Sequence, residues 1–579
     1  MKQLISTLFL LVLTTTTEAR DKVGTYSIIG GDQANPHAVA NLRALLDTTT
    51  FDGDITVYIG ERGDRSVARY KRRIPSQPDG FYINVGKGTI VVAGNNERGT
   101  LYGVDELARH IDHINDNMLT EHADYPAISF RGVVEGFYGT PWSHEARMSQ
   151  LDFYRTCRLN TYIYGPKDDP YHSSPHWREP YPEREAAQIG ELVSRARSNG
   201  VDFVWAIHPG KDIKWTESDL DSLIGKFESM YDLGVRSFAV FFDDISGDGT
   251  NPVRQAELLN NIDKRFVRVK GDVSQLIMCP TEYNRSWVNP EKGYLTTIGR
   301  LLNPSVKIMW TGDRVVSDIT AEGLEWIKGQ TGRPAYIWWN FPVSDYVRDH
   351  MLMGRVYGLT QESADMMSGF VTNPMEHAEA SKIAAYGVGK YCWNPALFDS
   401  HAAWDEALRA LMPCEHEALR IFAMHNSDMG QTGHKYRREE STNIAEVAER
   451  CLEKYRKNED CTAELSAMKE EFERMESAAD ILLGSNDNET LVKELTPWLL
   501  QFRVLARQGQ AVIKLATLSR GDNTEACADD IELTRKHIEA LRQMTKTIDE
   551  QYNQNPYQPG VKCGTKVLQP FVNGLLEAM

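Results

Sequence analysis

The middle of the chain alternates short apolar runs with longer stretches in which apolar residues recur at helical spacing. The starts of these runs lie roughly 29 to 42 residues apart. Strands that alternate with helices at this spacing indicate parallel βα units, and eight such units predict a (β/α)8 TIM barrel within an α/β fold class. The runs cover residues 132–137, 161–164, 203–207, 238–242, 276–278, 306–310, 335–339 and 369–371, and the last has the weakest strand pattern.

The region before the barrel mixes strand-like and helix-like patterns. Three runs rich in β-branched and aromatic residues are punctuated by glycine, and a fourth segment carries apolar residues at helical spacing. These segments are residues 55–58, 81–85, 89–92 and 97–113. They predict a small N-terminal α/β domain over residues 21–125, followed by the barrel over residues 126–435.

The region after the barrel, residues 436–579, is predicted to be helical. No proline occurs from Cys414 to Thr496, and apolar residues recur at helical spacing amid charged ones. Residues 491–515 and 526–552 repeat this pattern. The region therefore predicts a C-terminal bundle of three or more helices, for which packing is the simplest role.

The first 20 residues resemble a secretory signal peptide. Lys2 gives a short basic start, residues 4–13 are largely apolar, and small residues surround a plausible cleavage point at residues 17–19. Ten residues are too few to span a bilayer, and a buried N-terminal helix is the alternative interpretation. No later segment has eighteen consecutive apolar residues. We therefore expect an exported chain, periplasmic or secreted, without a transmembrane segment.

Composition restricts the class of protein without naming an activity. The 579 residues are 41% hydrophobic and 25% charged, which is typical of a globular protein. A formal net charge of −17 argues against general nucleic-acid binding, which needs clustered positive charge. The eight cysteines form no CxxC motif or Cys/His cluster, so we expect no structural zinc site. The activity expected below needs neither a metal nor a cofactor. Cys451 and Cys461 could form a disulfide only if the helix breaks between them.

Polar, aromatic and glycine residues gather where the predicted barrel strands end, which is where barrel enzymes build their active sites. The most informative run, residues 238–242, leads into Asp243 and Asp244 with no lysine or arginine beside them. Two carboxylates held close together cannot both ionise easily, so one pKa should rise and the pair should divide into a proton donor and a carboxylate. Helix capping, or a divalent-cation site that includes Asp248, are the alternatives.

Adjacent carboxylates suit an unusual form of glycoside hydrolysis. Ordinary glycosidases carry their two carboxylates on different elements, several ångströms apart. When the nucleophile is the 2-acetamido group of the sugar itself, an oxazoline forms at the anomeric carbon. One carboxylate then orients the acetamido N–H, and its neighbour protonates the leaving oxygen.

Four motifs, distributed over the whole predicted barrel, resemble the family-84 glycoside hydrolases, the O-GlcNAcase and β-N-acetylglucosaminidase family. They are RGVVEGFYGTPWS at residues 131–143, YGPKDDPYH at 164–172, FDDI at 242–245, and WWNFPV at 338–343 followed by Asp345. The N-terminal α/β region and the C-terminal helices also resemble the bacterial members. The resemblance implies the same three-part architecture.

The resemblance assigns roles around the acetamido group of the substrate. It implies that Asp243 orients and stabilises this group and that Asp244 is the general acid and then the general base. Tyr283 would donate a hydrogen bond to the acetamido oxygen. Tyr138 and Trp338 would wall the acetamido pocket, although Trp338 could also belong to the core.

The resemblance also implies contacts to the rest of the sugar. Gly136 would offer its backbone carbonyl to the sugar hydroxyls, Lys167 would add a charged hydrogen bond, and Asp345 would accept from the 4- and 6-hydroxyls. Asn373 would add a polar contact, and Asn340 would help near the leaving group. Without the resemblance, Gly136 could simply make a tight turn and Lys167 could be a solvated lysine at the rim.

Two further polar residues are interpreted as structural: His208, at the third strand end, and Arg131, before the first strand.

We therefore expect a retaining exo-β-N-acetylglucosaminidase that removes terminal β-linked GlcNAc from glycans or glycoproteins. One alternative is an endo-acting hyaluronidase, which an acidic chain fits poorly because hyaluronan is a polyanion. Another is a non-catalytic glycan-binding or adhesion protein, against which Asp243 and Asp244 argue. Oligomeric state is left open.

Overall fold

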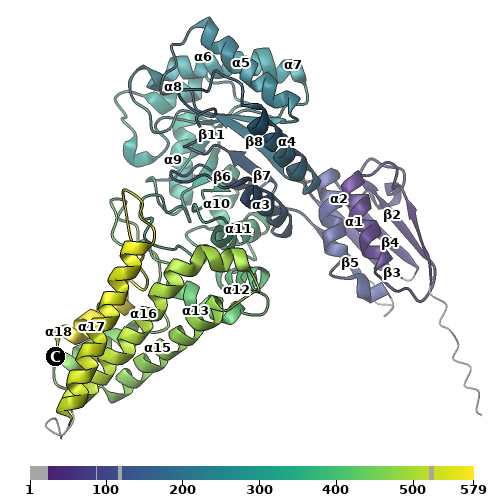
Figure 1. Cartoon of the computed structure of the whole chain (residues 1–579). Coiled ribbons are helices and arrows are strands. Elements are labelled where there is room, and N and C mark those ends of the chain that lie inside the picture. The colour runs from purple at the N-terminus through teal and green to yellow at the C-terminus, as the bar shows by residue number, and fades with distance from the viewer. Residues whose placement is uncertain (1–23, 87, 115–119, 521–526) are drawn as a thin grey trace, which may run out of the picture. The chain divides into compact units, whose positions relative to one another are not determined.

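The computed structural model describes residues 24–86, 88–114, 120–520 and 527–579 (Figure 1). It divides into two compact units, one ending at Tyr125 and the other beginning at Pro126. The predicted signal peptide lies outside the described residues. Among the helices that are described, none combines the length and the apolar character needed to cross a membrane.

The described residues of the N-terminal unit form a five-stranded mixed sheet with two α-helices. Its strand order is β1-β2-β4-β3-β5, in which β1, β2 and β4 are parallel and β3 runs antiparallel to both of its neighbours. Asn35 and Asn96 cap the two helices by accepting backbone N–H groups, as helix N-termini require. The elements are β1 (Tyr26–Ile29), α1 (Pro36–Asp47), β2 (Ile55–Glu61), β3 (Phe81–Gly86), β4 (Thr89–Gly94), α2 (Glu97–Leu107) and β5 (Thr120–Asp124). The predicted helix 97–113 is shorter than expected, since α2 ends at Leu107 and a 3-10 turn follows at Ile111–Ile114.

The second unit contains a closed barrel of eight parallel strands, which confirms the predicted fold class. Strand β13 pairs with β6 and closes the barrel. The strands are β6 (Arg131–Glu135), β7 (Thr161–Tyr164), β8 (Asp202–Ile207), β9 (Ser237–Phe241), β10 (Ile277–Cys279), β11 (Lys307–Trp310), β12 (Ala335–Trp339) and β13 (Met367–Thr372).

Helices follow the strands and bury their apolar stripes on the outside of the barrel. They are α3 (His144–Thr156), α4 (Glu183–Ser198), α5 (Glu217–Asp232), α6 (Pro252–Ile262) with α7 (Arg268–Lys270), α8 (Tyr294–Leu301), α9 (Ala321–Thr331), α10 (Gln361–Ala364) and α11 (Ala378–Trp393). Successive strand residues point alternately inward and outward. Trp338 accordingly belongs to the cluster inside the barrel, and Trp339 belongs to the outer core.

The C-terminal part is helical, as predicted, and its long helices α15, α16 and α17 pack side by side (Figure 1). The elements are α12 (Ser400–Leu411), α13 (His416–Met424), α14 (Ala445–Arg456), α15 (Thr462–Leu483), α16 (Glu489–Arg520), α17 (Ala528–Gln551) and α18 (Leu568–Glu577). Helix α13, which precedes the predicted boundary at residue 435, packs against α15, which follows it. The helix does break between Cys451 and Cys461, and both thiols are free.

Candidate active site

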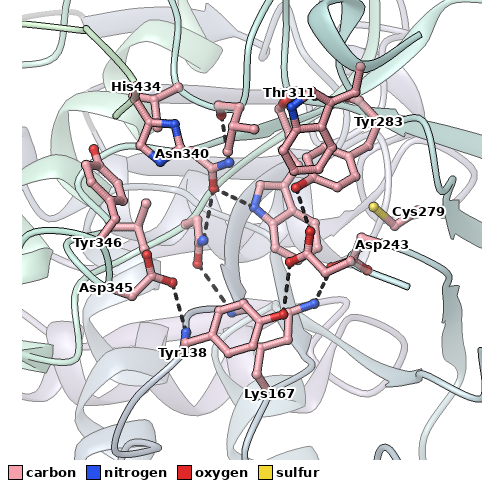
Figure 2. A pocket seen from close by; sticks show the side chains of 18 residues that line it. Tyr138, Lys167, Asp243, Cys279, Tyr283, Thr311, Asn340, Asp345, Tyr346 and His434 are labelled. Atoms are coloured by element: carbon pink, nitrogen blue, oxygen red, sulfur yellow. Dashed lines mark hydrogen bonds and ion pairs between the residues drawn. The ribbon is translucent and has the colours of Figure 1, made fainter. Parts of the chain in front are cut away.

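A pocket of about 210 Å³ opens at the carboxyl-terminal rim of the barrel (Figure 2). The structure brings all ten predicted site residues to its wall, although they follow different strands of the barrel. These are Gly136, Tyr138, Lys167, Asp243, Asp244, Tyr283, Trp338, Asn340, Asp345 and Asn373. The volume suits a single sugar ring, and the mixture of aromatic and polar side chains is typical of a site that binds a sugar.

Asp243 is a buried carboxylate that is paired on one oxygen and free on the other. It is 5% exposed, and its Oδ2 forms an ion pair with the Lys167 ammonium. Its Oδ1 is buried and accepts no hydrogen bond from any described residue. Burial alone would raise the pKa of Asp243, but the charge of Lys167 and the hydrogen bond that it donates outweigh burial and lower it. Asp243 is therefore ionised at pH 7, and its Oδ1 stays available as an acceptor.

His208 fixes the backbone beneath this carboxylate. Its Nε2 lies 2.8 Å from the carbonyl oxygen of Asp243 and 3.6 Å from Asp243 Oδ1. Burial lowers the pKa of His208, so the ring is neutral at pH 7 and donates its Nε2–H to the carbonyl. His208 was predicted to be structural, and its contact with the Asp243 carbonyl gives it a definite part in holding this residue.

The backbone of Asp244 departs from the extended conformation of the strand that precedes it. Its φ of 52° lies in the left-handed region, which costs a non-glycine residue about 1–2 kcal/mol. Adjacent residues of a regular strand point to opposite faces, so this turn is what allows both aspartates to line one pocket. Asp244 accepts hydrogen bonds from Tyr138 Oη at 2.9 Å and from Tyr283 Oη at 2.8 Å. Burial and the nearby aspartates raise the pKa of both phenols, which therefore remain donors.

A relay of amides connects three strand ends behind the sugar pocket. Asn340 Oδ1 accepts from Trp338 Nε1 at 2.9 Å and from Asn373 Nδ2 at 3.0 Å, and Asn373 Oδ1 accepts from Gly136 N at 3.3 Å. Asn340 Nδ2 donates to the carbonyl of Val315 at 2.8 Å. The Asn340 oxygen thus orients Trp338 and Asn373, while its amide nitrogen is held by Val315.

Gly136 is required for a reason other than a turn. A Cβ atom at this position would lie 2.3 Å from Cζ2 of Trp338. The indole therefore packs directly on the backbone, and no larger residue fits.

The loop that carries Tyr138 is held by carboxylates from several rim segments. Four of its backbone N–H groups each donate to a different acidic side chain. The pairs are Tyr138 with Asp345 at 2.9 Å, Gly139 with Asp168 at 3.0 Å, Thr140 with Glu376 at 3.4 Å and Trp142 with Glu135 at 3.1 Å. Burial raises the pKa of Asp345, and the Tyr138 amide opposes this effect. The loop is therefore fixed to the barrel by its main chain.

The part of the chain that the structure describes holds no group of three or more histidine, cysteine or acidic side chains placed to bind a metal ion. Asp248, which the cation-site interpretation required, forms an exposed ion pair with Arg254 at 2.8 Å.

Several lining residues were not predicted as site residues. They are Cys279, Trp287, Thr311, Val315, Val316, Val343, Tyr346 and His434. Thr311 directly follows β11, so its position at a strand end was a usable signal. His434 comes from the segment between α13 and α14, where no strand end marks it.

A closed parallel barrel whose rim pocket holds a free buried carboxylate oxygen beside a second carboxylate defines a glycoside hydrolase of the barrel class. The family model for β-N-acetylglucosaminidase matches residues 131–424, and the model for the bacterial GH84 post-catalytic domain matches residues 440–576. The chain belongs to glycoside hydrolase family 84, the β-N-acetylglucosaminidases.

Individual relatives agree with this assignment. The protein O-GlcNAcases of Rattus norvegicus and Mus musculus are each 34% identical over 265 residues, which is 44% of this chain and 29% of theirs. The structure of CpGH84B is 30% identical with a TM-score of 0.82 and covers 96% of both chains. CpGH84D is 28% identical with a TM-score of 0.85, covering 96% of this chain and 95% of its own. A mutant O-GlcNAc hydrolase of Thermobaculum terrenum is 25% identical, with a TM-score of 0.66 over 78% of this chain and 94% of its own.

Proposed function

We propose that this chain is a retaining exo-β-N-acetylglucosaminidase that removes terminal β-linked GlcNAc through an oxazoline intermediate. The observation that carries the proposal is the buried Oδ1 of Asp243, an ionised acceptor to which none of the described residues donates a hydrogen bond. A buried polar atom is normally satisfied, and an acetamido N–H would satisfy this one. Asp244 lies next in the chain and reaches the same pocket.

The proposed reaction divides the two aspartates by role. In the first step the acetamido oxygen bonds to C1, the glycosidic C1–O bond breaks, and Asp244 gives its proton to the leaving oxygen. Asp243 accepts the acetamido N–H and stabilises the positive charge that develops on the ring. In the second step water bonds to C1, the oxazoline C1–O bond breaks, and Asp244 takes the proton from the water. Two inversions at C1 give net retention.

The proposed substrates are glycoproteins or glycans that end in β-linked GlcNAc, and the relatives named protein O-GlcNAcase support a glycoprotein. The apolar stretch at residues 4–13 supports export to the periplasm or beyond.

Hyaluronan hydrolysis is less well supported by the pocket. Its lining contains three aspartates and one lysine, and that lysine is paired with Asp243. The glucuronate carboxylates of hyaluronan would meet negative charge at this wall. Incubation with hyaluronan and with a chromogenic β-GlcNAc separates the two activities. Depolymerised hyaluronan with an intact chromogen would contradict the proposal, and no hydrolysis of either would favour a glycan-binding protein.

The roles of the two aspartates are tested by leaving-group dependence. Asp244→Asn should lose most turnover on aryl GlcNAc substrates with poor leaving groups and keep much of it on activated ones, because only the former need protonation. Asp243→Asn should lose turnover on both. Asp248→Asn, an exposed aspartate on the following turn, is the matched control and should behave as wild type. Equal loss on both substrate types in Asp244→Asn would remove its assignment as the acid.

A further inference from the structure

One end of the sugar pocket is closed by two side chains from distant parts of the sequence. Tyr346 and His434 lie together with Asp345 on the side of the pocket away from Asp243 (Figure 2). Their rings meet edge to face with centroids 4.5 Å apart. The Tyr346 hydroxyl also donates to Met429 Sδ at 3.1 Å. These contacts join a barrel loop to the segment that follows the barrel.

The segment that carries His434 is a compact loop, residues 429–437, fixed at its base. Asp428 is 1% exposed and accepts hydrogen bonds from Gly430 N at 2.9 Å and from Arg437 Nε at 2.8 Å. The hydroxyl of Tyr436 donates to Asp318. The base and this anchor hold the loop so that His434 projects into the sugar pocket.

A second and larger cavity lies on the other side of this loop. Its volume is about 610 Å³, nearly three times that of the sugar pocket, and Tyr346 lines both cavities. Residues 429–433 line the larger cavity, whereas His434 lines the sugar pocket. Its other walls are polar and include Asp349, His350, Arg437, Gln558, Lys562 and Gln569. Such donors and acceptors are the groups that bind sugar hydroxyls.

We infer that Tyr346 and His434 form a partition that restricts hydrolysis to unextended terminal GlcNAc, and that the 610 Å³ cavity behind it can receive a second sugar once the partition is opened. The inference rests on the proposed function and on the role that the family resemblance implies for Asp345, which is to accept from the 4- and 6-hydroxyls of the sugar. A substituent on the 4-hydroxyl must then leave the pocket where the two rings stand. Removing the imidazole opens this path without touching either catalytic aspartate.

The test compares two chromogenic substrates, 4-nitrophenyl β-GlcNAc and the 4-nitrophenyl β-glycoside of N-acetyllactosamine. The second carries galactose on the 4-hydroxyl, which a GlcNAc-specific exo-enzyme cannot trim first. Wild type should cleave only the monosaccharide. His434→Ala should release intact N-acetyllactosamine, and its kcat/KM ratio of disaccharide to monosaccharide should rise at least tenfold. Tyr346→Ala opens the partition from the barrel side and should shift the ratio in the same direction.

Controls separate this inference from the proposed function. His537→Ala replaces an exposed histidine of α17 and should leave the ratio unchanged. The inference is overturned if wild type already cleaves the disaccharide, or if both partition variants cleave the monosaccharide with an unchanged ratio. If wild type cleaves neither substrate, the proposed function fails. Calorimetric titration with free GlcNAc and N-acetyllactosamine then still tests the partition, because only the opened variants should bind the disaccharide.

Discussion

Replacing Lys167 with methionine removes the ammonium that pairs with Asp243 and keeps a side chain of similar length. Both side chains are buried, with 5% and 7% exposure, so water cannot take over the role of the lysine. Breaking a buried ion pair by removing one partner typically costs about 3–5 kcal/mol. Alternatively, the unpaired aspartate becomes protonated in the folded state. Protonating a carboxyl group with an ordinary pKa of about 3.9 at pH 7 costs about 4 kcal/mol, at 1.36 kcal/mol per pKa unit. We therefore expect a loss of about 3–4 kcal/mol of stability at pH 7.

The stability of Lys167→Met should also depend on pH with the opposite sign from the contribution that Asp243 makes in wild type. In wild type the folded pKa of Asp243 is lowered, so its stabilisation is present above the unfolded pKa and is lost as pH falls through the folded pKa. In Lys167→Met, the main group that opposes burial is gone, and we expect burial to raise the folded pKa of Asp243 above the unfolded one. The folded state then binds more protons, and stability falls by up to about 1.4 kcal/mol per pH unit as pH rises between the two pKa values.

Urea unfolding of both proteins at a series of pH values from 4 to 8 measures this difference directly. Other titrating groups are shared, so subtracting the two curves isolates Asp243. Lys167→Met/Asp243→Asn is the matched control and should recover stability at pH 7, because no buried charge remains unpaired. Turnover of Lys167→Met should fall about 10²–10³-fold at pH 7, as expected when one charged stabilising interaction is removed. A difference curve that stays flat, with less than about 1 kcal/mol lost at pH 7, would refute the ion-pair reasoning.

Two further changes test packing and a remote carboxyl. Gly136→Ala places a Cβ 2.3 Å from Trp338 Cζ2, so we expect about 1–3 kcal/mol of destabilisation in thermal unfolding and a lower kcat/KM. Gly190→Ala, where no atom lies within 4 Å of the added Cβ, should be neutral or stabilising, and equal effects of the two would contradict the clash. Burial raises the pKa of Glu494 to about 7, so its contribution to stability is lost as pH rises from its unfolded value through 7. Glu494→Gln should flatten that decline by about 1–3 kcal/mol in urea titrations at pH 5 and 8, and an unchanged slope would show that Glu494 titrates normally.

The barrel was predictable because its strands are buried on both faces. Such strands are short, continuous apolar runs, and the runs 161–164 and 335–339 coincide with β7 and β12. The predicted run 369–371 was short because β13 begins at Met367 with two half-buried residues. Helix α2 ends earlier than its apolar spacing indicated, because spacing alone does not mark where the backbone turns.

The site residues that could be predicted are those that lie at strand ends or within the family motifs. In a parallel barrel, the residues that follow the strands all lie at one rim. Their proximity could therefore be predicted once the barrel itself was predicted. The left-handed backbone of Asp244 could not be predicted, since aspartate adopts it only when the surrounding structure compensates the strain. His434 was missed because its loop owes its position to Asp428 and Tyr436, whose contacts are long-range or irregular.

Some of the acidic side chains of this chain hold the loop at the rim of the barrel that carries Tyr138. Four carboxylates accept the backbone N–H groups of the loop that carries Tyr138, and Tyr138 in turn donates to Asp244. Asp345 both accepts from the Tyr138 amide and lines the sugar pocket. A sugar that binds Asp345 therefore acts on the same loop that orients the proposed acid. Acidic residues at the rim thus position the aromatic wall as well as performing the proposed chemistry. A polyanionic substrate would be repelled by both sets of carboxylates.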